Sequence, residues 1–245
     1  MPTITSELLR ALPKAELHCH LDGSVRPSTL LELAREYRQR MPADDPEALA
    51  EHMVVRDAHN LEEYLARFTT TLSVLQHADA VEREAFELVE DAALDGVRYI
   101  EMRYSPVLNT NAGLELGETV DATLRGIARA ERAHGTRARV ILCGLRHLSP
   151  HVSLELARLA VAYRDRGVVG FDLAGGEAGH PARVHAEAFV YARDHDLGVT
   201  VHAGQGDGAA SVRQAVHDCG ANRLGHATRL IDDDRLTRYV NDRRI

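Results

Sequence analysis

The strongest constraint on the fold is a repeat in which a short apolar segment is followed by a longer segment of helical periodicity. The apolar segments cover residues 16–21, 97–104, 139–145, 168–174, 198–203 and 223–227. The cores of the predicted strands are almost continuously apolar, as in strands covered on both faces, and no hairpin turn joins two of them. Segments between them, such as 27–40, 61–76 and 80–95, carry apolar residues three and four positions apart. This alternation predicts an α/β protein with a parallel sheet.

The turn after the first strand distinguishes between two possible folds with a parallel sheet. A doubly wound, dinucleotide-binding sheet carries a Gly-x-Gly-x-x-Gly turn there, whereas residues 20–24 read HLDGS. A TIM-type (β/α) barrel, with its site at the C-terminal strand ends, therefore fits better. A closed barrel has about eight strands and this sequence shows about six, so we expect an incomplete barrel that stops before closure at Ile245. Residues 1–245 are expected to form a single domain.

Composition and charge argue against several partners and locations. The 245 residues carry a formal net charge of −8 without a Lys/Arg-rich run, which gives no support for nucleic-acid or membrane-surface binding. No apolar run is long enough for a membrane span, and the N-terminus lacks a signal-peptide profile. The cysteines, Cys19, Cys143 and Cys219, are odd in number and far apart. We therefore expect free thiols and a cytoplasmic location.

A His-x-His pair ends the first predicted strand. Side chains alternate along a strand, so His18 and His20 point to one side and Cys19 to the other. Two neighbouring imidazoles at a strand end make a metal chelate, because neutral histidine is a good ligand for zinc and related ions. Asp22 follows in the turn and can face the same pocket. The alternative is that one or both histidines pack or cap the turn.

Other strand ends carry further polar groups. Asp172 lies within the 168–174 strand, while His202 and His226 end the last two strands. In a barrel these ends share one rim, so His202 can join His18 and His20 on one divalent ion. Three histidines with an open position for water are typical of a catalytic site, since the ion lowers the pKa of that water to about 7. His226 could then orient the water or take its proton, or it could be a packed histidine.

Five motifs in this order resemble those of a known family. They are LPKAELHCHLDGSVRP (12–27), RYIEMRYSP (98–106), VVGFDLAGGE (168–177), VTVHAGQ (199–205) and RLGHA (223–227). Together they span almost the whole chain and look like the motifs of adenosine deaminases, which belong to the amidohydrolase barrels. The resemblance implies a cytoplasmic, zinc-dependent hydrolase that converts adenosine and water to inosine and ammonia, with a purine nucleoside as its small-molecule partner.

The resemblance also implies roles for single residues. His18, His20 and His202 would bind one zinc ion per chain, and His226 would act on the zinc-bound water that attacks C6 of the purine. On the substrate side, Asp22 would hold a ribose hydroxyl and Gly175 would offer its backbone to the purine ring. His20 would also lie against the substrate.

The sequence departs from the family pattern in places that matter for catalysis. Gln205 stands where the family has the glutamate that protonates the purine ring, and a neutral amide cannot exchange a proton at pH 7. The later Asp-Asp motif, which supplies a zinc ligand and a purine contact, does not occur before Ile245. Residues 232–234 (DDD) instead indicate the start of a helix. Gly176 replaces the usual Asp, and Ala227 follows His226 where the family has Gly.

Three hypotheses follow. The first is an adenosine deaminase-like hydrolase impaired by Gln205 and by the missing Asp pair. The second is a catalytically inactive protein that binds purine nucleosides or regulates another protein. The third is a fragment that does not fold stably alone, because an open barrel exposes sheet edges that a homo-oligomer would have to cover.

Overall fold

The computed structural model describes residues 4–56 and 58–245, which cluster into two compact units. Unit 1 comprises Met1–Val54 and Phe68–Val140, and unit 2 comprises Val55–Arg67 and Ile141–Ile245. The expectation of a single domain stays a prediction. Among the described residues, none of the helices has both the length and the apolar character that a membrane span requires.

Six strands occur in the described residues and follow chain order in the sheet. They are β1 (Lys14–His20), β2 (Val97–Tyr104), β3 (Arg137–Leu145), β4 (Val168–Ala174), β5 (Gly198–Ala203) and β6 (Arg223–His226). The β1–β2, β4–β5 and β5–β6 pairs are parallel. A doubly wound sheet reverses its strand order, whereas a (β/α) barrel does not. The expected fold class, an incomplete TIM-type barrel with six strands, is confirmed.

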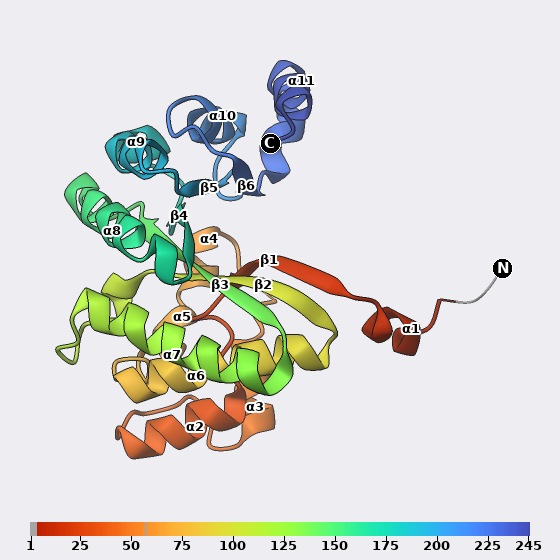
Figure 1. Cartoon of the computed structure of the whole chain (residues 1–245), viewed down its shortest axis with the longest axis vertical. Coiled ribbons are helices and arrows are strands. Elements are labelled where there is room, and N and C mark those ends of the chain that lie inside the picture. The colour runs from red at the N-terminus through yellow and green to blue at the C-terminus, as the bar shows by residue number, and fades with distance from the viewer. Residues whose placement is uncertain (1–3, 57) are drawn as a thin grey trace. The chain divides into compact units, whose positions relative to one another are not determined.

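Unit 1 packs its longest helices against each other. Its helices are α1 (Ser6–Ala11), α2 (Pro27–Glu36), α3 (Pro46–Met53), α5 (Phe68–Leu72), α6 (Ala78–Leu94), η1 (Pro106–Asn109) and α7 (Leu116–His134). Helices α6 and α7 lie side by side (Figure 1). A Cβ at Gly126 would lie 2.2 Å from the Glu82 carbonyl oxygen, so this close approach requires glycine.

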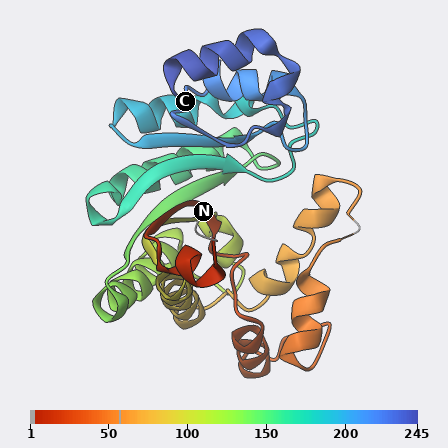
Figure 2. The ribbon, with the colours of Figure 1, turned by 90° about the vertical axis from the view of Figure 1, so that its right-hand side faces the viewer.

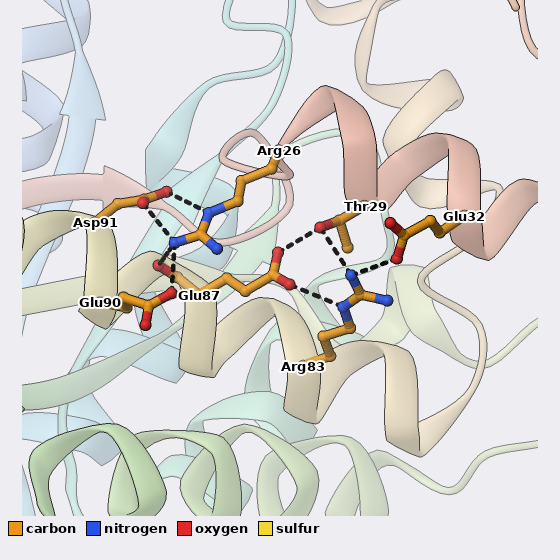
Figure 3. Close-up of polar contacts among 7 residues, drawn as sticks. All are labelled: Arg26, Thr29, Glu32, Arg83, Glu87, Glu90 and Asp91. Atoms are coloured by element: carbon orange, nitrogen blue, oxygen red, sulfur yellow. Dashed lines mark hydrogen bonds and ion pairs between the residues drawn. The ribbon is translucent and has the colours of Figure 1, made fainter. Parts of the chain in front are cut away.

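A polar network ties α2 to α6 (Figure 3). Arg26, just before α2, donates to Asp91 at 2.5 Å and to Glu90 at 2.7 Å. Glu87 accepts hydrogen bonds from Thr29 at 2.6 Å and from Arg83 at 2.8 Å. The network holds the segment that follows β1 against α6.

The helices of unit 2 are α4 (Leu61–Leu65), α8 (Pro150–Ala162), η2 (Arg164–Arg166), η3 (Ala182–His185), α9 (Ala186–Asp194), α10 (Ala209–His217), η4 (Thr228–Asp232) and α11 (Asp234–Arg243). Unit 2 places α8, α9, α10 and α11 along one side of its strands (Figures 1 and 2). The core is aliphatic apart from Phe171 and Phe189, whose ring centroids are 5.1 Å apart. Asp233 caps α11 by accepting the Leu236 N–H, which confirms that the acidic run opens a helix.

One predicted helix is wrong as drawn from the sequence. The spacing predicts a single helix over residues 61–76, but α4 ends at Leu65 and α5 spans Phe68–Leu72. The break coincides with the boundary between the two units at Arg67 and Phe68. Apolar periodicity is a local signal and does not show where a helix ends. In the structure α4 has no buried residue, and Thr71 is the buried residue of α5.

Candidate active site

A bulge shapes the end of β1, where His18 and His20 lie. Between Glu16 and Cys19 the pairing with β2 shifts, so β1 carries one extra residue there. The Glu16 side chain accepts the His18 N–H at 2.7 Å, and the buried Arg103 donates to the Leu17 carbonyl at 2.6 Å. These contacts satisfy backbone groups at the bulge. The His18 and His20 ring centroids are 5.6 Å apart, so the structure brings this predicted pair together.

Asp22 follows β1 in a buried turn. The Leu21 N–H donates to the Arg103 carbonyl at 2.9 Å, which holds the turn to β2. Burial raises the pKa of Asp22 to about 7. One of its oxygens lies 3.9 Å from His20 Nδ1, and Gly23 packs on Phe68. Asp22 therefore lies beside the histidine pair, as the sequence predicts.

At the end of β5, buried charged groups hold His202. The Asp172 carboxylate lies 2.9 Å from His202 Nδ1, and Arg146 donates to the His202 carbonyl at 2.7 Å. A carboxylate in this position orients the imidazole ring of His202. The Arg146 side chain is buried, and burial lowers its pKa.

His226 ends β6 next to His202, with ring centroids 5.3 Å apart. It is exposed, so the alternative of a packed core histidine is wrong. His226 and Ala227 have φ angles of 61° and 52°, in the left-handed region that costs non-glycine residues roughly 1–2 kcal/mol each. The strand end therefore keeps a strained backbone where the family pattern has glycine after the histidine.

The turns after β4 and β5 place Gly175 and Gln205. Gly175 has a φ of 94°, which only glycine adopts readily, and this confirms a tight turn after the strand. Gln205 has an exposed side chain, and its N–H donates to Glu177 at 2.8 Å. Helix α4 rests on both turns. A Cβ at Gly176 would lie 3.0 Å from the Glu62 carboxylate, and a Cβ at Gly206 would lie 3.1 Å from the Leu61 side chain.

Some residues that hold the site were missed in the sequence. Arg146 directly follows β3, and Glu177 lies in the turn after β4, so the strand-end signal that points to His202 could have found both. Glu16 and Arg103, which support the bulge, carry no such signal. The bulge depends on how two strands pair, and pairing is not visible in either strand alone.

In each unit, the described residues offer donors that suit a metal ion. His18 and His20 supply two neighbouring imidazoles in unit 1, and His202 supplies an imidazole oriented by a carboxylate in unit 2. Imidazole nitrogens suit zinc, copper, iron and nickel, so the donor chemistry fits a transition-metal centre. This fit rests on the residues themselves and does not select one metal.

Comparison with known proteins gives a family. The family model for adenosine deaminase matches residues 13–245. A probable adenosine deaminase of Dictyostelium discoideum is 45% identical over 244 residues, which cover 99% of this chain and 32% of that protein. The adenosine deaminase of Mycobacteroides abscessus is 45% identical over 251 residues, covering 95% of this chain and 69% of that protein. The chain thus spans only part of the length of these relatives.

Solved structures of similar fold agree. A cog1816 amidohydrolase from Burkhoderia ambifaria with bound Zn is 27% identical, with a TM-score of 0.87 and coverage of 98% of this chain and 67% of that chain. Arabidopsis ADAL complexed with IMP is 31% identical, with a TM-score of 0.82 and coverage of 98% and 71%. Because the family model matches nearly all of this sequence and close relatives match it end to end, the chain belongs to the adenosine deaminase family.

Proposed function

We propose that this chain is a metal-dependent hydrolase that deaminates adenosine-type purine nucleosides. The observation that carries the proposal is the arrangement at the end of β5, where the Asp172 carboxylate lies 2.9 Å from Nδ1 of His202 and orients its ring. A histidine in this arrangement is typical of a metal ligand, and His226 lies beside it. Membership of the adenosine deaminase family supports the reaction class.

The proposed ligands are His18, His20 and His202, which are imidazoles suited to one divalent ion. We propose zinc, one ion per chain, because a zinc-bound amidohydrolase is among the similar structures. When bound, the ion supplies the activation of water that hydrolysis at neutral pH requires. His226, exposed next to His202, then accepts or holds the proton of the attacking water.

Asp22, Gly175 and His20 are the proposed substrate contacts. The Asp22 carboxylate accepts a hydrogen bond from a ribose hydroxyl, and its buried oxygen has no hydrogen-bond partner among the described residues. Gly175, whose φ of 94° places it in a tight turn after β4, donates its backbone N–H to a purine ring nitrogen. Arabidopsis ADAL binds IMP, a purine nucleotide, which supports a purine ligand for this chain.

Gln205 limits the proposed reaction. Its amide donates a hydrogen bond to the purine ring but supplies no proton to it at pH 7. General acid catalysis contributes roughly 100- to 10,000-fold, so we expect slow turnover with binding retained. The cytoplasmic location and a homo-oligomer remain predictions.

The test is conversion of adenosine to inosine by the purified chain, measured by chromatography with and without added zinc. We expect slow, zinc-dependent turnover that rises about 100- to 10,000-fold in Gln205→Glu. Gln39→Glu, an exposed change in unit 1, is the control and should leave turnover unchanged. If Gln205→Glu binds adenosine in calorimetry but forms no inosine, the proposal is wrong and the binding-protein hypothesis replaces it.

A further inference from the structure

The carboxylate of Glu177 lies in a nest of hydrogen-bond donors just after β4. It accepts the backbone N–H groups of four consecutive residues and one hydroxyl. They are Gly204 at 2.6 Å, Gln205 at 2.8 Å, Gly206 at 2.6 Å, Asp207 at 3.1 Å, and the hydroxyl of Ser211. The side chain is buried. All of these groups belong to unit 2.

Such a nest is an anion-binding device. Consecutive N–H groups that converge on one point, close to the start of α10 at Ala209, give the concave positive surface that binds phosphates and carboxylates in other folds. Here the chain fills the nest with its own carboxylate. Burial alone would raise the pKa of Glu177, but hydrogen bonds from Ser211 and the backbone outweigh it and hold the pKa below its usual value.

The nest shapes the turn between two site residues. His202 lies two residues before Gly204, and Gln205 is itself one of the donors. Just before the turn, the Arg146 guanidinium donates a hydrogen bond to the His202 carbonyl at 2.7 Å. Gly204 has a φ of 72°, and a Cβ there would lie 2.6 Å from Val212, so this position of the turn requires glycine.

We infer that Glu177 is a positioning residue whose carboxylate holds the Gly204–Asp207 turn, and with it His202 and Gln205. Glu177 acts through the turn and does not itself bind substrate or metal. Without its carboxylate, the four N–H groups converge on a space of carboxylate size. A small carboxylate from solution, such as formate, will then bind there and restore the turn, because an anion is what the nest is built to hold.

The test combines Glu177→Ala with formate. Two-dimensional NMR should show that formate shifts the amide resonances of residues 204–207 in Glu177→Ala and leaves them unchanged in the wild type. This readout needs neither metal nor turnover, so it separates failure of this inference from failure of the proposed function. Glu187→Ala, an exposed change in unit 2, is the matched control and should show no formate effect.

A second readout rests on the proposed metal ligands. Zinc affinity, measured by calorimetry, should fall about 10- to 100-fold in Glu177→Ala, the usual cost of removing a group that orients a ligand. Formate should recover most of the loss, while formamide, a neutral molecule of similar size, should not. A purely structural role would give a loss that formate and formamide leave equally unchanged, and that result would overturn the inference.

Two milder variants keep the test decisive if Glu177→Ala does not fold. Glu177→Asp keeps the anion but shortens its reach, so some of the four amide resonances should shift while the rest stay. Ser211→Ala removes one donor and leaves the backbone donors in place, so the amide resonances of residues 204–207 should barely move. Shifts of equal size in both variants would contradict a nest that depends on the carboxylate.

Discussion

Two buried glutamates, one in each unit, have pKa values shifted in opposite directions. Glu84 on α6 is fully buried, and neither of its oxygens has a hydrogen-bond partner among the described residues. Glu177 after β4 is also buried but accepts hydrogen bonds from four N–H groups and a hydroxyl. The pKa of Glu84 is raised well above its usual value, mainly by burial, whereas that of Glu177 is lowered.

The difference shows that burial by itself does not decide the charge of an acid. Burial disfavours the charged form of both groups, and only donors aimed at the carboxylate reverse that effect. Neighbouring charges add to the contrast, since Glu87, Asp91 and Asp22 raise the pKa of Glu84 further while Arg26 lowers it. The folded state therefore favours the neutral form of Glu84 and the charged form of Glu177.

The largest effect is expected for Glu177→Gln. An amide keeps one acceptor oxygen but turns its NH2 group toward N–H donors, which leaves buried donors unsatisfied. We expect the free energy of unfolding at pH 7 to fall by about 2–4 kcal/mol, measured by urea denaturation. A loss no larger than that of the exposed control Glu187→Gln would remove the contrast between the two glutamates.

The two acids should give stability opposite dependences on pH. The pKa of Glu177 is lower in the folded state, so its contribution is present above about 4.5, the usual value, and is lost as the pH falls through the folded-state pKa. The pKa of Glu84 is higher in the folded state, so stability decreases as the pH rises from about 4.5 to the folded-state pKa.

Denaturation curves of the wild type and of each Gln variant, taken between acidic and neutral pH, check these signs. The destabilisation in Glu177→Gln should shrink on acidification. The free energy of unfolding of Glu84→Gln should increase relative to that of the wild type as the pH rises. Parallel pH profiles for the two variants would mean that both acids have the same charge.

Ser211→Ala should have a smaller effect than Glu177→Gln. It removes one donor to the Glu177 carboxylate and leaves the four backbone donors. A hydrogen bond to a charged group contributes about 1.5–3 kcal/mol at most, so we expect a loss near the low end of that range, measured by urea denaturation. The control is Ser73→Ala in unit 1, which removes a local hydroxyl bond to a backbone carbonyl and should cost less.

The smallest effect is expected for Glu84→Gln at neutral pH. Burial shifts the wild-type side chain toward its neutral form, and the amide has nearly the same shape. We expect the free energy of unfolding to change by less than about 1 kcal/mol. A large loss would show that Glu84 is ionised and held by a group that compensates its charge.

Much of the candidate site could be predicted from sequence. His18, His20, His202 and His226 were found because each lies at the end of a strand, and strand ends follow from local apolar patterns. The bulge at His18 could not be predicted, because it depends on the pairing of β1 with β2. The single helix predicted over 61–76 failed for a similar reason, since a local period does not show where a chain passes from one unit to another.

The sequence by itself determined the alternation of strands and helices, the fold class, and the candidate residues of the site. Only the tertiary structure decided which buried polar groups are satisfied. Glu177 meets its donors about thirty residues further along the chain, and Asp172 meets His202 across a similar interval. Hydrogen bonds depend on distance and direction between groups, and folding alone sets these for residues far apart in sequence.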